Sequence, residues 1–277
     1  MAAVLALLSA ATYGVGDFCG GLAARRIPAS SVVLWSHLLG LVLLLASTAF
    51  VSGEVVGGDL LIGALGGLCG AVGVGLLYKG LSIGQMSVIA PVTALLSAAV
   101  PVVAGYVAGE RPRGTAVAGM VLALVAIVLV SAEGDGSLRP TDLRGVTYAL
   151  GAGMGFGLFF VALSHTGDDA GLWPLVAARA ASVSVLGAAA LVGVVSRRAP
   201  IPGSRGLTAA AGALDAQANV LYLLAVRQGL VSVISVLAAL YPVSTVILAR
   251  VVLHERFAKV QIAGMALALP ATILMAA

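Results

Sequence analysis

The hexapeptide GQMSVI at residues 84–89 returns as GLVSVI at residues 229–234, and the two copies are separated by 145 residues. The same shift aligns residues 76–132 with residues 221–277 without a gap, and 20 of the 57 aligned pairs are identical. The identities include ER at 110–111 and 255–256, and AGM at 118–120 and 263–265. A match of this length at one fixed spacing indicates an internal duplication.

The composition of the chain indicates a membrane protein. Of its 277 residues, 61% are hydrophobic and only 9% are charged, and the mean hydropathy is +1.13. Soluble domains carry about 25% charged residues, and disordered chains are poor in aliphatic side chains. Both classes are therefore excluded. Because a helix needs about 20 apolar residues to cross a bilayer, the chain is long enough for about ten spans and leaves no room for a soluble domain.

Hydropathy and the breaker-rich connections predict an all-α polytopic membrane protein with ten transmembrane helices. We expect two five-helix repeats, at residues 1–135 and 143–277, with the polar segment Glu133–Asp142 as the linker. An odd number of spans in each repeat makes equivalent helices cross the bilayer in opposite directions. Such inverted repeats are the basis of many secondary transporters. The helices are expected at residues 2–22, 32–51, 60–78, 86–108, 115–132, 145–164, 172–195, 207–226, 231–253 and 260–277.

Each half ends in the same order of features: a proline-containing helix, an acidic loop and a glycine-containing helix. Pro242 and Glu255 supply the first two features in the second half, whereas in the first half Pro101 lies one turn beyond the equivalent position. This arrangement resembles the EamA family of the drug/metabolite transporter (DMT) superfamily, and the resemblance covers essentially the whole chain. The Trp-Gly pair of that family is replaced by Tyr13–Gly14 and Met154–Gly155. The resemblance implies a ten-helix transporter and does not indicate the substrate.

Polar residues inside the predicted spans are the candidate substrate-binding residues. An ionisable group inside a span costs about 3 kcal/mol or more, so it marks a functional site by default. Three of the candidates fall at i, i+4 and i+7 on one face of helix 207–226, and this polar stripe predicts a cavity lining. The equivalent face of helix 60–78 is rich in glycine and predicts helix packing. The candidates are Asp17, His37, Arg179, Asp215, Asn219 and Tyr222.

Each charged candidate has two interpretations. Arg179 is expected either to bind a substrate carboxylate through two parallel hydrogen bonds or to neutralise Asp215. Asp17 is either a cavity or proton-coupling carboxylate or an interfacial carboxylate, and His37 is either a second cation of the site or a hydrogen-bonded core histidine. The set predicts a midplane cavity that suits a zwitterionic ligand. Its lining is expected from helices 2–22, 60–78, 86–108, 145–164, 207–226 and 231–253.

Two prolines are predicted to interrupt helices and to act in gating. Pro101 and Pro242 each lack a backbone donor and free the carbonyl four residues earlier. In transporters such breaks serve as flexible points or as polar cavity lining. The alternative is a static kink at each position.

These features predict a secondary transporter for a small metabolite, an amino acid or drug-like compound, with efflux as the expected direction. Alternating access is expected, with titratable side chains available for proton coupling. No nucleotide, metal or nucleophile motif is present, so neither a cofactor nor enzymatic activity is expected. A passive channel or a non-transporting scaffold is the alternative. A third hypothesis, an intramembrane aspartyl protease, follows from G-x-G-D at 14–17 with Asp215 as second carboxylate, but the repeat places Leu158 at the position of Asp17.

The expected partners are a small-molecule substrate and the lipid bilayer, without nucleic acid, for a monomer or homodimer in the plasma membrane. Loop charges predict the orientation, because Lys and Arg accumulate in cytoplasmic loops. The side that holds both termini carries three basic residues, Arg111, Arg113 and Arg227. The opposite side, which we therefore expect to be cytoplasmic with both termini outside, carries ten: Arg25, Arg26, Lys79, Arg139, Arg144, Arg197, Arg198, Arg205, Arg256 and Lys259.

Overall fold

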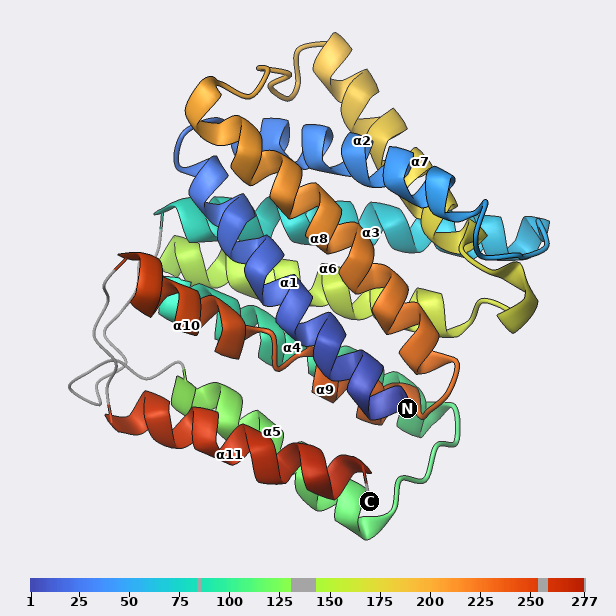
Figure 1. Ribbon diagram of the computed structural model, residues 1–277, viewed down its shortest axis with the longest axis vertical. Helices are drawn as coiled ribbons and strands as arrows, with labels where there is room; N and C mark the ends of the chain where they lie inside the picture. Colours follow the sequence, from blue (N-terminus) through green and yellow to red (C-terminus); the bar gives the residue numbers. More distant parts are fainter. Residues whose placement is uncertain (84–85, 131–142, 254–258, 277) are drawn as a thin grey trace.

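The computed structural model describes residues 1–83, 86–130, 143–253 and 259–276, and this part of the chain is helical without strands (Figure 1). Nine of its segments are long and apolar enough to cross a membrane, counting α9 and α10 as one broken span, and α5 is a shorter apolar helix. The predicted all-α polytopic membrane fold is confirmed. The helices are α1 (Ala2–Ala24), α2 (Ala29–Ser47), α3 (Gly57–Ile83), α4 (Met86–Val107), α5 (Gly114–Val130), α6 (Leu143–Ser164), the 3₁₀ turn η1 (Asp168–Ala170), α7 (Trp173–Leu191), α8 (Pro202–Val226), α9 (Val231–Ala238), α10 (Pro242–Leu253) and α11 (Lys259–Ala276).

Prolines define where three helices begin. α2 follows Pro28 directly, α8 starts at Pro202, and Pro174 lies in the first turn of α7. Proline fits this position because the first turn of a helix has no intrahelical partner for its N–H groups, and proline lacks that group. For this reason α2 and α8 begin before residues 32 and 207, where hydropathy alone placed their starts.

The two prolines expected to interrupt helices behave differently. Pro242 does so: the N–H groups of Leu240 and Tyr241 bond three residues back, to the carbonyls of Leu237 and Ala238, and α9 ends there. The interruption expected at Pro101 is wrong, because Pro101 lies inside the unbroken helix α4. A proline removes one hydrogen bond, and the rest of the helical ladder continues when neighbouring helices hold it in place.

The two halves interlock through equivalent contacts (Figure 1). The first helix of each half packs on the third helix of the other, as α1 does on α8 and α6 on α3. The second helices likewise pack on the third helices, in the pairs α2–α8 and α7–α3, and the last helices α5 and α11 pack on each other. Exchanging the halves therefore preserves these contacts, as a two-fold relation between them requires. The halves form one interwoven body whose centre lies between α1, α3, α6 and α8.

The glycine face of α3 is a packing surface. A Cβ at Gly63 or Gly67 would collide with the backbone of α7 at Pro174 or Ala178. Further along the same helix, glycine allows the ring of Phe156 from α6 to come close at Gly73. Small residues at such positions let helix backbones approach within a membrane, where dispersion contacts replace the hydrophobic effect.

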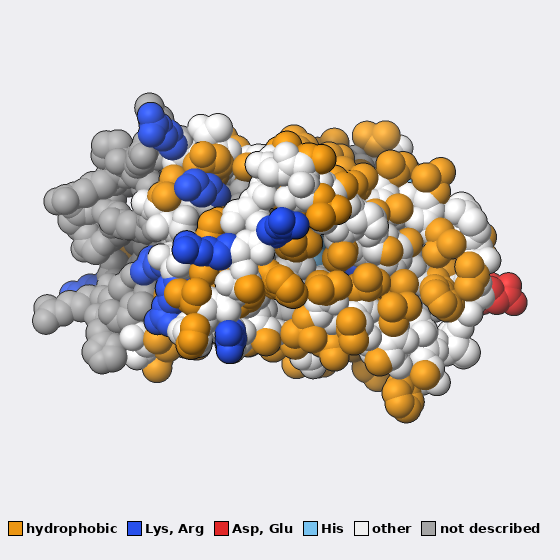
Figure 2. All heavy atoms as spheres, turned by 90° about the horizontal axis from the view of Figure 1, so that it is seen from above, with side chains coloured by type: hydrophobic (Ala, Val, Ile, Leu, Met, Phe, Trp, Pro, Cys, Tyr) orange, Lys and Arg blue, Asp and Glu red, His pale blue; other side chains and the backbone are white. Residues whose placement is uncertain are grey.

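Exposed charge gathers toward the two ends of the molecule, and apolar side chains cover most of the surface between them. Figure 2 shows Lys and Arg gathered toward the left of the view, and an acidic group at the right. We call these the basic end, where α1, α3 and α7 finish, and the acidic end, where α2, α4, α6 and α8 finish. Within the described residues every carboxylate other than those of Asp17 and Asp215 lies at the acidic end: Glu54, Asp59, Glu110, Asp168 and Asp169.

The close approach of α3 to α7 predicts that Gly67→Ala destabilises the protein. The new methyl group would meet the backbone of Ala178, and overpacking of this kind costs about 1–3 kcal/mol. Thermal unfolding of the purified protein in detergent would show this as a lower midpoint. Gly75→Ala is the matched control on the same helix, because a Cβ there has no neighbour within 4 Å. Equal midpoints for the two variants would contradict the packing described here.

Candidate functional site

An ion pair lies at the centre of the molecule, between Arg179 of α7 and Asp215 of α8. The second guanidinium nitrogen of Arg179, Nη1, is 2.8 Å from Nε2 of His37 on α2, and Nδ1 of His37 is 2.9 Å from Oγ of Ser182. Ser182 donates in turn to the backbone carbonyl of Arg179, at 3.0 Å. Arginine only donates, so Nε2 accepts and His37 carries its proton on Nδ1. The four residues thus form a closed chain of donors and acceptors.

Burial explains why these partners are needed. The side chains of Arg179 and Asp215 are 9% and 17% exposed, and His37 is almost fully buried. A lone charge inside a bilayer is costly, and a buried pair is tolerated when further hydrogen bonds complete it. Of the two interpretations of Arg179, this conformation shows the neutralisation of Asp215. His37 acts as a hydrogen-bonded partner of the guanidinium and is not a second cation of the site.

Asn219 extends the network toward the first half of the chain. Its amide nitrogen donates to the backbone carbonyl of Asp215 at 2.7 Å and to the carboxylate at 3.2 Å, and its amide oxygen accepts from the hydroxyl of Tyr13 on α1 at 2.7 Å. Tyr13 was not among the predicted site residues. The available signal was its position one turn before Asp17, at the place where the EamA pattern has tryptophan.

Tyr222 lies outside this network, although it shares a stripe with Asp215 and Asn219. Its hydroxyl is 2.8 Å from Oγ of Ser235 on α9, and its ring stacks on Phe160 with the centroids 4.2 Å apart. The side chain is fully buried. Tyr222 therefore joins α6, α8 and α9 in the core and does not line the central cavity.

Asp17 is buried on α1 and is separate from the ion pair. It lies between Gly14 and Gly20 on the helix, and these two glycines face Tyr241 and Tyr78. No hydrogen bond or ion pair reaches its carboxylate from the part of the chain that the structure describes. A carboxylate in this position is costly when ionised, and none of the described residues supplies a cation to balance it.

The cavity at the centre has a volume of about 20 Å³, close to the space that one buried water needs. Residues at equivalent positions of the two repeats meet in it: Gly70 and Asp215, and Val74 and Asn219. Its walls come from α1, α3, α6, α7 and α8. The expected lining is corrected in two respects, because α7 contributes Ala178 and Arg179, while α4 and the α9–α10 segment do not reach it. These two segments pack further out, against α6 and α1. At this size the cavity has no room for a metabolite.

A cluster of contacts joins the loops of the acidic end, within the second half and between the halves, and we call it the latch. Arg227, at the end of α8, donates to the carbonyl of Gly167 at 2.9 Å and lies 3.7 Å from the carboxylate of Asp168. Burial lowers the pKa of the Arg227 guanidinium from its ordinary value, and the charge of Asp168 opposes this shift. The loop before α3 joins the same cluster, since the N–H of Glu54 donates to the carbonyl of Asp169 at 2.7 Å.

Glu110 joins the two halves at a second point of the acidic end. Its two carboxylate oxygens accept from the backbone N–H groups of Val231 and Ser232, at 2.6 and 3.0 Å. These groups begin α9, where a helix has unpaired donors and a partial positive charge. Glu110 therefore connects the loop after α4 to the broken helix of the other half. The repeat equivalent of Glu110, Glu255, and the linker Glu133–Asp142 lie outside the described residues.

Comparisons with known proteins identify the family. The model of the EamA-like transporter family matches residues 1–132 and again residues 143–277. No curated protein matches the sequence. Among solved structures, 18 chains match. One crystal structure, whose description names no activity, superposes with a TM-score of 0.73 at 18% sequence identity, covering 97% of this chain and 98% of the other. At this identity the likeness shows a shared fold.

The ion pair predicts how the thermal stability of the single variants compares with that of the double variant. Asp215→Asn or Arg179→Gln alone leaves one buried charge without its partner, which costs about 3–5 kcal/mol. The double variant Arg179→Gln/Asp215→Asn buries no charge, so we expect it to be more stable than either single variant in thermal unfolding. Arg25→Gln, at an exposed position, is the control and should leave the midpoint unchanged. Additive losses in the double variant would show that the two charges do not compensate each other.

Proposed function

The chain belongs to the EamA-like transporter family, and on this basis we propose that it moves a small zwitterionic metabolite, such as an amino acid or an amino-acid-like drug, by alternating access. The observation that carries the proposal is the Arg179–Asp215 pair beside the central cavity. We propose export as the direction, in keeping with the expectation from sequence.

The charge pair favours a zwitterion over other small solutes. A ligand that separates Arg179 from Asp215 must compensate both charges, because either charge left alone in the membrane costs several kcal/mol. A carboxylate can take the place of Asp215 on the guanidinium, with the two parallel hydrogen bonds that arginine favours. An ammonium group on the same ligand can then take the place of Arg179 on Asp215. A ligand of one charge would leave the other residue unpaired.

Alternating access is supported by the small size of the central cavity and by the inverted repeat. A cavity of about 20 Å³ cannot hold a metabolite, so the halves must separate before one can bind. The Glu54–Asp169 contact of the latch and the Glu110 contacts are hydrogen bonds between segments of different repeats, which such a separation would break. Because the repeats are related by an inverted topology, the same sequence can close either end with similar contacts.

Asp17 is the residue that we propose for proton coupling. It is buried, lies one turn from Tyr13, and has no cationic partner among the described residues. A carboxylate of this kind gains and loses a proton when its access to water changes, whereas Asp215 is held in its ion pair. Movement of α1 against α8 would change that access.

The competing functions predict other features. A passive channel needs a continuous open path, whereas the central cavity described here has room for about one water. A scaffold would have no reason to keep a buried ion pair beside a cavity. The protease hypothesis requires two carboxylates that share a proton, but Asp215 is paired with Arg179 and no hydrogen bond joins it to Asp17. Members of this family are transporters and not enzymes.

Counterflow in proteoliposomes tests this proposal. Vesicles loaded with one unlabelled amino acid should take up the same labelled amino acid faster than empty vesicles, for at least one member of a panel of neutral amino acids. Asp215→Asn should abolish this uptake, because the ammonium loses its partner. Tyr222→Phe, which alters a side chain on the same helix outside the cavity, should retain it. Labelled flux without acceleration by internal substrate would instead indicate a channel.

The same vesicles distinguish substrate exchange from transport coupled to protons. Asp17→Asn should still exchange substrate, because exchange moves no net proton, but should no longer accumulate it in response to a pH gradient. Accumulation that persists in Asp17→Asn would remove Asp17 from the coupling role.

We further propose that the basic end faces the cytoplasm, that both termini lie outside, and that the protein acts in the plasma membrane as a monomer or homodimer. The support is the accumulation of Lys and Arg at one end (Figure 2). A C-terminal alkaline phosphatase fusion should be active in cells, and a green fluorescent protein fused at the same position should be dark. The reverse result would overturn the orientation.

A further inference from the structure

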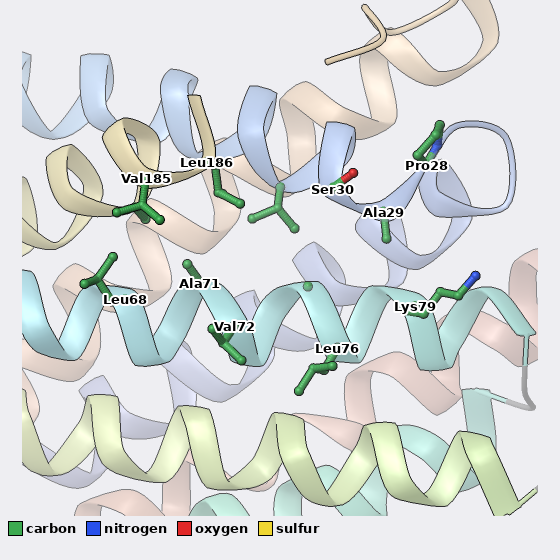
Figure 3. Close-up of a pocket in the computed structure, with 13 residues that line it drawn as sticks. Pro28, Ala29, Ser30, Leu68, Ala71, Val72, Leu76, Lys79, Val185 and Leu186 are labelled. Atoms are coloured by element: carbon green, nitrogen blue, oxygen red, sulfur yellow. The ribbon is translucent and has the colours of Figure 1, made fainter. Parts of the chain in front are cut away.

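A groove of about 630 Å³ separates α3 from α2 and α7 (Figure 3). Two of its wall residues, Val72 and Val185, are 59% and 53% exposed, so the groove opens outward, toward the surface that the bilayer covers. Its volume falls within the range of ligand-binding pockets. The wall is mainly apolar and is formed by Leu68, Ala71, Val72, Leu76, Val185 and Leu186.

The length of the groove matches one leaflet of a bilayer. It follows α3 from Leu68 to Lys79, and at about 1.5 Å per residue these 11 steps span roughly 16 Å. The hydrocarbon core of a bilayer is about 30 Å thick, so this distance is close to half of it. A groove that runs from mid-membrane to the surface fits an acyl chain of a single leaflet.

The outer end of the groove is cationic. Lys79 lies on the same side of the groove as Pro28 and Ser30, away from Leu68 and Val185 (Figure 3). No carboxylate among the described residues pairs with Lys79. The alkyl part of a lysine can follow an apolar wall while its ammonium reaches the level of the lipid headgroups. Basic pockets between helices at this level bind anionic lipid headgroups.

We propose that this groove binds one anionic phospholipid of the leaflet at the basic end. One acyl chain lies between α3 and α7, and the phosphate contacts the ammonium of Lys79 and the hydroxyl of Ser30. The inner wall includes Ser182, which bonds to His37 of the central network, so the lipid contacts the helix that carries Arg179. The inference does not depend on which solute the protein transports.

Native mass spectrometry of the purified full-length protein tests the proposal with two lipids of equal chain length, phosphatidylglycerol and phosphatidylcholine. The unaltered protein should retain phosphatidylglycerol in preference. Lys79→Ala should reduce that preference roughly fivefold, as expected for one lysine near an anionic lipid. Lys259→Ala, at the basic end but at the start of α11, should not reduce it.

Groove-filling variants test the position of the acyl chain. Gly75 lines the groove and a Cβ there meets nothing within 4 Å, so Gly75→Leu places a side chain in the groove and should remove the retained lipid. Gly187→Leu, on α7 with equally open surroundings and outside the groove lining, should retain it. Equal lipid retention in Gly75→Leu and Gly187→Leu, or an equal loss of preference in Lys79→Ala and Lys259→Ala, would overturn the proposal. Displacement of the lipid by transported amino acid would also overturn it, because the groove would then be a substrate portal.

Discussion

The arrangement at the centre of this protein depends on one ion pair inside the membrane, between Arg179 and Asp215. Neither charge is tolerated alone in the bilayer interior, so each constrains the position of the other. Both belong to the second half of the chain, yet the first half completes their hydrogen bonds, through His37 on the guanidinium and through Tyr13, by way of Asn219, on the carboxylate side. Any movement of one half against the other therefore changes the surroundings of the pair, and in the proposed function this would couple substrate binding to conformational change.

The duplication explains how a single polar site can lie between two repeats of similar structure. The equivalent positions Gly70 and Asp215 line the same cavity, as do Val74 and Asn219. One copy carries small or apolar residues that let α3 approach α7 and α6, and the other carries the polar groups. Symmetry thus provides two similar ways to close the molecule, while the difference between the copies provides one polar site. An inverted repeat with two identical faces would bring like charges together at its axis.

The sequence was sufficient to predict the helices, but it predicted the residues of the candidate site only in part. Hydropathy predicted the spans because a membrane permits few structures other than apolar helices. Spacing along α8 correctly placed Asp215 and Asn219 together, but it also included Tyr222, which lies two turns from Asp215 and packs on Phe160 instead. The contact of His37 with Arg179 depends on how α2 and α7 pack, and the periodicity of a single helix does not encode that packing. For the same reason, periodicity did not indicate that α7 forms part of the cavity wall.

The central claim, that the ion-pair site opens alternately to each end, is tested most directly by labelling a cysteine in the cavity wall. Gly70→Cys, in a background with Cys19→Ala and Cys69→Ala, should react slowly with a membrane-impermeant maleimide applied from either side. Oxidising a cysteine pair at Glu54 and Asp169, where the backbones already touch across the latch, should stop labelling from the acidic end alone, and reduction should restore it. Labelling from the acidic end that persists in the oxidised protein, or labelling from neither side before oxidation, would contradict alternating access at this site.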